Sequence, residues 1–294
     1  MVRFADVAEP APGHTEVVVA VEAFSINRGE TFLLEKPRDG WRPGKDVVGR
    51  IAVAAADGSG PPIGTRVVAH PPAGGWAERV AVGVDRLATL PDSVRSADAA
   101  ALPLAGLTAL RLFRAAGSLA GRRVLITGAA GGVGHFFVEL AASVGSAVTA
   151  VVASKERGRR LLELGAQRVI TDLEDAEFGM DVVLESVGGA ATSAALARLA
   201  PRGQLIWFGQ ASRTPATIDF FSFFNRPRSA TIRHFDYTDS DVSDGEDLAT
   251  LVHLTTTGRL HPEIGVRDPW SETSARIADL RQRRILGKAI LTIE

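Results

Sequence analysis

The sequence predicts an α/β protein built from a doubly wound parallel sheet and a second, β-rich domain. Its 294 residues are long enough for two domains. Up to about residue 100, short β-branched runs are separated by Gly/Pro clusters such as DGSGPPIG, which is typical of strands and turns. Beyond that point strand-like runs alternate with segments of helical length, which is typical of parallel strands joined by crossover helices.

The same patterns place the elements in order. In the first part we expect strands at 17–21, 47–54 and 65–69. In the second part we expect them at 124–127, 147–153, 168–170, 181–185 and 204–209. A polar segment after Tyr237 precedes two helices, around 245–257 and 271–283, and a last strand at 289–293. Because this strand has no partner near by in the sequence, we expect it to return to the β-rich domain. That domain then comprises 1–100 and 239–294, and the parallel sheet lies in 101–238.

Composition limits the classes of partner. Lys+Arg number 33 and Asp+Glu number 34, so the net charge is −1, without the basic excess of a nucleic-acid-binding protein. There is no cysteine, which excludes disulfides, thiolate zinc sites and a cysteine nucleophile. The first residues carry charges at Arg3, Asp6 and Glu9, and no apolar run is long enough to cross a bilayer. We therefore expect a cytoplasmic protein that acts on a small molecule and binds neither nucleic acid nor membrane.

The most informative segment is VLITGAAGGVGHFF, in which a buried strand runs through glycines into an apolar helix. Gly128 permits a tight turn, Gly131 and Gly132 permit backbone approach to a pyrophosphate, and Gly134 lets the helix pack closely. The N–H groups at the start of the helix then face the phosphates. A Gly-rich turn with a structural role only is the alternative, but the strand–loop–helix context favours dinucleotide binding.

The end of the next strand indicates which dinucleotide. A site for NAD usually carries an acidic residue there, which bonds the ribose 2′-hydroxyl. This chain reads VVASKERGRR, with Ser154, Lys155 and Arg157 at that place. A hydroxyl and cations suit a 2′-phosphate, so the sequence favours NADPH. Arg159 and Arg160 are better explained as a solvated helix face.

Several segments in a fixed order resemble the medium-chain dehydrogenase/reductase superfamily, in its zinc-free quinone oxidoreductase and enoyl reductase branch. They are PGKDVVGRI, ALPLAGLTAL, ITGAAGGVG, DVVLESVGG, GQLIWFG and RRILGKAIL, and the likeness extends over nearly the whole chain. The resemblance implies a Rossmann domain and a discontinuous GroES-like substrate domain, with the active site between them. It also implies a homodimer, for which the segment 230–235 is a plausible edge strand.

The resemblance assigns roles to particular positions. The positions expected to bind the cofactor are Thr108, Gly131, Gly132, Val133, Ser154, Lys155, Arg157, Phe208 and Gly209. Asn27 matches a polar residue of the substrate domain that faces the nicotinamide, and we expect it to polarise the substrate carbonyl as the catalytic residue.

Four departures from the family pattern stand out. Lys45-Asp46 replaces the His-Glu pair of the zinc-dependent relatives, so no metal is expected. Phe32 replaces a tyrosine, and Asp172 replaces a tyrosine at the end of the third strand, where it would repel a phosphate. The first strand or hairpin of the family has no counterpart at the N-terminus.

These observations predict an NADPH-dependent oxidoreductase that transfers hydride to a quinone or an α,β-unsaturated carbonyl without zinc. Two alternatives remain open. One is a nucleotide-binding interaction protein in which the fold persists without turnover, and the other is a zinc-free alcohol dehydrogenase. The cluster FFSFFN is expected to line a substrate pocket or a subunit contact, with a core position about equally expected.

Overall fold

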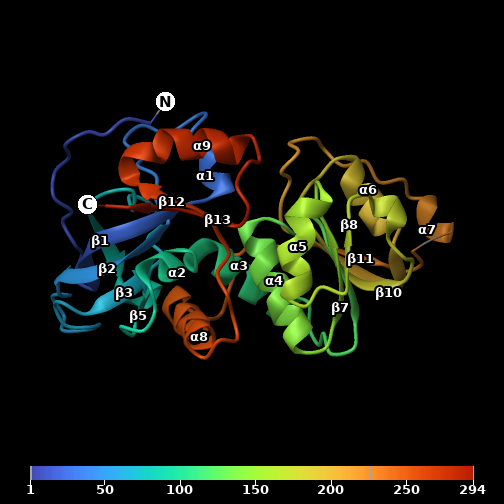
Figure 1. Cartoon of the computed structure of the whole chain (residues 1–294), viewed down its shortest axis with the longest axis horizontal. Coiled ribbons are helices and arrows are strands. Elements are labelled where there is room, and N and C mark those ends of the chain that lie inside the picture. Colours follow the sequence, from blue (N-terminus) through green and yellow to red (C-terminus); the bar gives the residue numbers. More distant parts are fainter. Residues whose placement is uncertain (1, 226, 294) are drawn as a thin grey trace. The chain divides into compact units, whose positions relative to one another are not determined.

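A computed structural model describes residues 2–225 and 227–293 of the chain (Figure 1). The chain divides into two compact units, Met1–Thr108 with Ser240–Glu294, and Ala109–Asp239. The first boundary falls inside helix α3, Pro103–Ala115, whereas the sequence placed it before this helix. The reason is local, because the Leu104 N–H at the start of α3 donates to Asp46 in the first unit at 2.9 Å.

The first unit contains a sheet of seven strands in the order β12-β13-β1-β2-β3-β5, with β4 also paired to β1. The strands are β1 Glu16–Ile26, β2 Asp46–Val53, β3 Arg66–Ala69, β4 Arg79–Gly83, β5 Leu87–Thr89, β12 Ile264–Pro269 and β13 Lys288–Thr292. Alternate β-branched residues of β1, β2 and β3 form its core, among them Val17, Val47 and Val67, all fully buried. The three strands predicted in this region are therefore confirmed, and β4, β5 and β12 are additional.

The C-terminal strand β13 pairs antiparallel with β1, Phe24 opposite Leu291, which confirms the predicted return to the first unit. The two predicted helices before it are α8, Asp244–Thr256, and α9, Thr273–Arg281. Ser243 caps α8 by accepting from the Glu246 N–H at 3.2 Å. The remaining helices of this unit are α1 Arg28–Leu33, α2 Ser96–Ala100, and the short 3₁₀ segments Val84–Arg86 and Trp270–Glu272.

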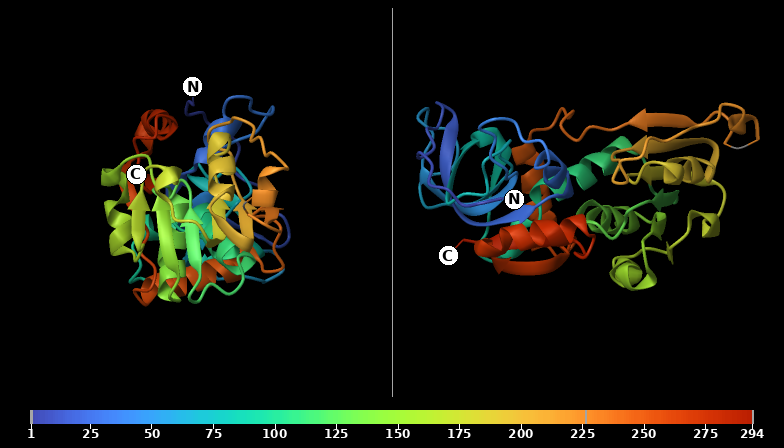
Figure 2. Two further views of the ribbon diagram at one scale, coloured as in Figure 1. Left: turned by 90° about the vertical axis from the view of Figure 1, so that its right-hand side faces the viewer. Right: turned by 90° about the horizontal axis from the view of Figure 1, so that it is seen from above.

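The second unit contains a sheet of six parallel strands in the order β11-β10-β9-β6-β7-β8, seen side by side in Figure 2 (left). They are β6 Arg123–Ile126, β7 Ala147–Val151, β8 Arg168–Ile170, β9 Met180–Glu185, β10 Leu199–Trp207 and β11 Thr231–His234. The helices are α4 Gly132–Ser143, α5 Lys155–Glu163, α6 Ala190–Leu196 and α7 Ser222–Asn225, with a 3₁₀ turn at Leu173–Asp175. The five predicted parallel strands are confirmed as β6 to β10.

From β6 the chain proceeds to β7 and β8 in one direction, and from β9 to β10 and β11 in the other. Right-handed crossovers then place α4 and α5 on one face of the sheet and α6 on the opposite face. This arrangement is doubly wound, as predicted. Over the described residues, we find no helix with the length and apolar character that a membrane span requires.

Candidate functional site

The glycine loop lies at the carboxyl end of β6 and leads into α4. Gly128 has φ of 64°, in the left-handed region that glycine adopts without strain. A Cβ on Gly134 would lie 2.1 Å from the Ala129 carbonyl oxygen, so only glycine allows α4 to start this close to the loop. Gly131 is the N-cap of α4, and Gly132 and Val133 form its first turn. The predicted strand–loop–helix context is confirmed, and the backbone suits a pyrophosphate.

His135 follows this turn. The residue is 2% exposed, and Nδ1 of its ring lies 2.9 Å from the carbonyl oxygen of Gly131. It therefore packs under the glycine loop, where it bonds the N-cap residue.

Ser154, Lys155 and Arg157 lie at the carboxyl end of β7, beside the glycine loop. Strands β6 and β7 are parallel neighbours, and the Ala129 N–H donates to the Val151 oxygen at 3.1 Å. Ser154 is the N-cap of α5, and its hydrogen bond to the exposed Glu156 carboxylate lowers the pKa of Glu156. The structure thus brings the candidate 2′-phosphate residues to the same sheet edge as the candidate pyrophosphate loop.

Asp172 lies two residues beyond the end of β8, the outermost strand on this side. Its carboxylate accepts from the Glu174 N–H at 2.9 Å and caps the short 3₁₀ turn that follows. The Asp172 carboxylate therefore has a structural role as the cap of this turn. It lies after β8, at the same carboxyl edge of the sheet as the glycine loop.

Phe208 and Gly209 follow β10, on the other side of the glycine loop. The Phe208 N–H donates to the Glu185 oxygen at 2.9 Å, and a Cβ on Gly209 would lie 3.2 Å from Ser186. These two residues share the carboxyl edge with the glycine loop. Thr108 belongs to the first unit, where its hydroxyl donates to the Leu104 oxygen at 2.6 Å and its side chain is buried.

Asn27 lies in a buried polar cluster of the first unit that the sequence did not predict. Its Nδ2 donates to Asp46 at 2.8 Å and to Glu30 at 3.2 Å. Its Oδ1 accepts from the Lys288 ammonium at 2.5 Å. Both amide hydrogens of Asn27 are therefore donated to carboxylates in this structure. The members of the cluster, all at most 5% exposed, are Ser25, Asn27, Glu30, Asp46, His70 and Lys288.

Asp46 is the centre of this cluster. It accepts from Ser25 at 2.5 Å and from Lys288 at 3.0 Å, and His70 Nδ1 lies 3.6 Å away. Burial alone would raise the pKa of the Asp46 carboxyl, but the Lys288 ammonium and the contacts from His70 and Ser25 hold it well below its ordinary value. Asp46 is therefore an ionised carboxylate.

Glu30 carries the opposite shift. Its carboxylate accepts from the Asn27 N–H at 3.0 Å and the Gly44 N–H at 2.8 Å. Burial, followed by the repulsion of Asp46, outweighs these hydrogen bonds and raises the pKa of Glu30 to about 7. The pKa values of these two buried carboxyl groups are thus shifted in opposite directions, that of Asp46 downward and that of Glu30 upward.

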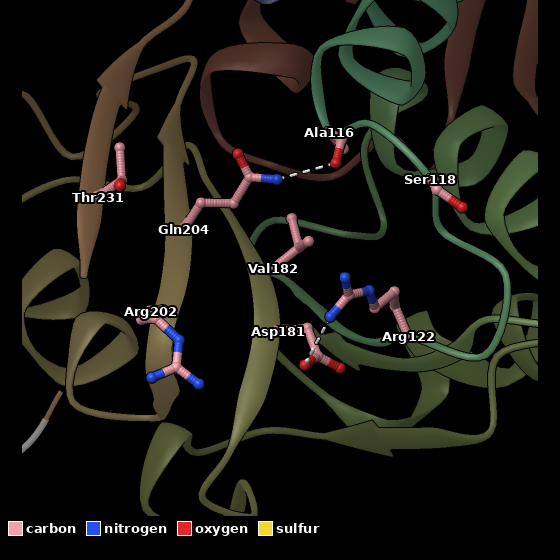
Figure 3. Close-up of a pocket in the computed structure, with 8 residues that line it drawn as sticks. All are labelled: Ala116, Ser118, Arg122, Asp181, Val182, Arg202, Gln204 and Thr231. Atoms are coloured by element: carbon pink, nitrogen blue, oxygen red, sulfur yellow. Dashed lines mark hydrogen bonds and ion pairs between the residues drawn. The ribbon is translucent and has the colours of Figure 1, made fainter. Parts of the chain in front are cut away.

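A cavity of about 300 Å³ in the second unit lies at the opposite edge of the sheet (Figure 3). Its walls include Arg122 before β6, Asp181 at the start of β9 and Thr231 at the start of β11. Arg122 is ion-paired to Asp181 at 3.4 Å. Ligands of doubly wound sheets bind at the carboxyl ends of the strands, and this cavity faces the amino ends. It is therefore separate from the candidate dinucleotide site.

A doubly wound sheet with a glycine loop at its switch point, accompanied by a discontinuous β-rich unit, defines a two-domain dinucleotide-binding protein. The family model described as zinc-binding dehydrogenase matches residues 132–254. The chain is 32% identical to a mycocerosic acid synthase-like polyketide synthase of Mycobacterium tuberculosis, over 99% of this chain and 15% of that protein. It is 30% identical to a quinone oxidoreductase of Mus musculus, over 69% of this chain and 67% of that protein.

Among solved structures, the mycobacterial protein Rv1454c, complexed with NADPH, aligns with a TM-score of 0.88 at 27% identity. The alignment covers 99% of this chain and 95% of that chain. The chain belongs to the medium-chain dehydrogenase/reductase superfamily, in its quinone oxidoreductase branch.

The donor set around Asn27 does not fit the zinc ion that the family description implies. Zinc in proteins is held by cysteine, histidine and carboxylate ligands. Here the Lys288 ammonium lies between Asn27 and Asp46 and supplies the positive charge. His70 Nδ1 lies 2.7 Å from the Lys45 carbonyl oxygen, so this nitrogen carries a proton and cannot ligate.

Proposed function

We propose that this chain is an NADPH-dependent oxidoreductase that transfers hydride to a quinone or an α,β-unsaturated carbonyl, without zinc. The observation that carries the proposal is the glycine loop after β6, which lies beside the segment Ser154–Arg157 after β7 at one edge of the sheet. Membership of the quinone oxidoreductase branch and the NADPH complex of a structural neighbour support it. Bound NADPH supplies the hydride; the chain's residues bind and orient it and exclude water.

The cofactor-binding residues in this proposal are those predicted from the sequence. The backbone of Gly131, Gly132 and Val133 receives the pyrophosphate, and Ser154, Lys155 and Arg157 receive the 2′-phosphate. Phe208 and Gly209 receive the nicotinamide end at the same edge, and Thr108 completes the set of cofactor-binding residues.

Replacing Arg157 by alanine tests the choice of cofactor. One charge-assisted hydrogen bond contributes about 1.5–3 kcal/mol, so the Kd for NADPH is expected to rise about 10- to 100-fold. The Kd for NADH, which lacks the 2′-phosphate, should stay within about twofold. Titration followed by nicotinamide fluorescence measures both. Arg159→Ala, an exposed arginine on the same helix, is the control. Equal losses for the two cofactors would remove Arg157 from this role.

Asn27 is the proposed residue for polarising the substrate carbonyl. To do so it must release one amide hydrogen, and the 3.2 Å bond to Glu30 is the longer of the two it makes. A protonated Glu30 is a weaker acceptor than a carboxylate, which favours this release. Because both amide hydrogens of Asn27 are already donated to Asp46 and Glu30, neither is available for a substrate in this structure. This observation favours the second candidate, a nucleotide-binding interaction protein without turnover.

The variant Asn27→Ala separates these two candidates. If Asn27 polarises the carbonyl, turnover with quinones or enones should fall about tenfold or more, while the Kd for NADPH stays near the wild-type value. Initial rates and fluorescence titration give the two quantities. A wild-type rate in the variant would end the catalytic assignment. Absence of turnover in the wild-type protein, with NADPH bound, would favour the interaction protein.

We also propose that the enzyme is a homodimer joined through β11. This strand is the edge of the six-stranded sheet, and all four of its residues are exposed. Near it in the sequence, Phe220, Phe221 and Phe224 are 68%, 72% and 64% exposed, with ring centroids 5.7–6.3 Å apart. Exposed rings and an open strand edge suit contact with a second copy. Phe223, by contrast, packs on the core of the second unit.

Ile232→Pro tests this interface, because proline removes an N–H and disturbs the strand edge. The sedimentation coefficient is expected to fall from that of a dimer to that of a monomer. Ile63→Pro, at an exposed loop position of the first unit, is the control. An unchanged sedimentation coefficient in Ile232→Pro would contradict pairing through β11.

A further inference from the structure

The switch point of the six-stranded sheet lies between β6 and β9. These strands are neighbours, yet the chain leaves them toward opposite edges of the sheet. In doubly wound sheets the ligand crevice opens at this point, outside the carboxyl ends of the strands. The loops that leave β6 and β9 therefore form the two walls of the crevice. Any group that fixes one loop against the other also fixes the width of the crevice.

Glu185, the last residue of β9, lies at this place and is fully buried. One carboxylate oxygen accepts from the Thr127 hydroxyl, at the start of the glycine loop, at 3.1 Å. The same oxygen accepts from the Val187 N–H at 2.8 Å and the Gly188 N–H at 3.2 Å. The other accepts from Gly188 at 3.1 Å and from the Thr192 hydroxyl of α6 at 2.8 Å. All five of these hydrogen bonds are donated to the Glu185 carboxylate.

A second set of bonds extends this connection to the loop after β10. The Ser186 N–H donates to Thr127 Oγ1 at 2.9 Å, and the Ser186 hydroxyl donates to the Thr127 oxygen at 3.2 Å. The N–H groups of Ala211 and Ser212 donate to the oxygens of Ser186 and Val187 at 2.9 and 2.7 Å. The loop Ser186–Gly188 is thus bonded to the glycine loop on one side and to the segment after Gly209 on the other.

We propose that Glu185 is a positioning residue for the dinucleotide, which holds the loop Ser186–Gly188 against the glycine loop across the switch point. The proposal rests on the proposed function, since it assumes that NADPH occupies this crevice. Glu185 acts without contact to the cofactor, through Thr127 and through the backbone of residues 186–188. The positions of these residues set how the pyrophosphate loop faces the nicotinamide end.

The chemistry of the contacts requires a carboxylate. An ionised carboxylate is an acceptor at both oxygens and can satisfy N–H and O–H donors on both sides. Glutamine has nearly the same shape, but only one of its two terminal atoms accepts. With its nitrogen on the Thr127 side it opposes the N–H groups of Val187 and Gly188, and with its nitrogen on the Thr192 side it opposes the Gly188 N–H, while the Thr192 hydroxyl turns to accept. Either orientation of the amide weakens the hold on Gly188.

The test compares Glu185→Gln with Thr192→Val. The second variant also removes a bond of the buried carboxylate, but it leaves the bonds to Thr127, Val187 and Gly188 in place. We expect Glu185→Gln to raise the Kd for NADPH tenfold or more, and Thr192→Val to leave it within about threefold, with both variants lowering Tm. The ratio of the Kd values for NADH and NADPH should not change in either, because Ser154 and Arg157 lie at the end of β7. Fluorescence titration and thermal unfolding give these readouts without turnover.

A second pair keeps the test decisive if Glu185→Gln does not fold. Thr127→Val removes the hydroxyl that joins Glu185 to the glycine loop, and Thr127→Ser retains it. Thr127→Val should weaken NADPH binding, whereas Thr127→Ser should bind NADPH about as tightly as the wild-type protein. Wild-type affinity in Glu185→Gln or in Thr127→Val, or equal losses in Glu185→Gln and Thr192→Val, would overturn the positioning role. Failure of the wild-type protein to bind NADPH would instead overturn the proposed function itself.

Discussion

Replacing Lys288 by methionine is expected to lower the free energy of unfolding by about 3–5 kcal/mol. Lys288 is 3% exposed, and its ammonium bonds Asp46 at 3.0 Å and Asn27 at 2.5 Å. Removal of one partner of a buried ion pair leaves the other charge without compensation in a medium of low polarity. Here the charge left behind is Asp46, which also anchors the start of α3 through Leu104.

The loss should be largest near neutral pH and should shrink as pH falls. Because Lys288 helps to hold the pKa of Asp46 below its ordinary value, Asp46 adds stability at pH values above 3.8 that is lost as pH falls toward its folded-state pKa. Without Lys288 that pKa rises, so Asp46 is protonated at a higher pH in the variant and ceases to be an uncompensated buried charge. The difference in the free energy of unfolding between wild type and variant should therefore narrow in acid. Urea unfolding of both proteins at neutral pH and at several acidic pH values measures the two effects.

Lys36→Met, at an exposed position, is the control for the loss of a positive charge. It should change the free energy of unfolding by less than about 0.5 kcal/mol. The double variant Lys288→Met/Asp46→Asn should be less destabilised than the sum of the two single variants, because the remaining charge is removed. A loss below about 1 kcal/mol in Lys288→Met would show that the pair does not hold β13 in the first unit.

This pair also shows what the sequence could and could not predict. The strands of the parallel sheet follow from local runs such as DVVLE, and the glycine loop follows because Gly128 and Gly134 occupy places where a Cβ is strained or blocked. Each of these signals lies within a few residues. The return of β13 was predicted as well, because an apolar C-terminal run needs a sheet to pair with.

The polar cluster was missed because its members are brought together by the topology alone. Lys288 is 261 positions from Asn27 and 242 from Asp46, and no spacing along the chain connects them. They meet because β13 pairs with β1 and β2 pairs with β1. The sequence therefore assigns Asn27 only from its resemblance to a position that faces the nicotinamide, whereas in the structure its amide is bound to buried carboxylates. Glu185 was visible only as a charged residue that ends an otherwise apolar strand.

Glu30 is expected to make the protein less stable as pH rises from about 5 to about 8. In the folded state its pKa is raised to about 7 from the ordinary value of 4.5, mainly by burial and then by Asp46. Between these two values the folded state binds more protons than the unfolded state, so the free energy of unfolding falls with rising pH. A shift of this size corresponds to about 3 kcal/mol in total.

Glu30→Gln should remove this slope, because glutamine does not titrate. The absolute stability also changes, since glutamine offers one acceptor fewer to the N–H groups of Asn27 and Gly44, so the slope is the quantity to compare. Urea unfolding at several pH values gives it, with Glu9→Gln, an exposed position, as the control. Parallel slopes in the wild type and in Glu30→Gln would mean that Glu30 is ionised throughout this range. At neutral pH an ionised Glu30 would hold the amide hydrogen of Asn27 more strongly than a protonated Glu30 does. The assignment of Asn27 as the residue that polarises the carbonyl would then lose its physical basis.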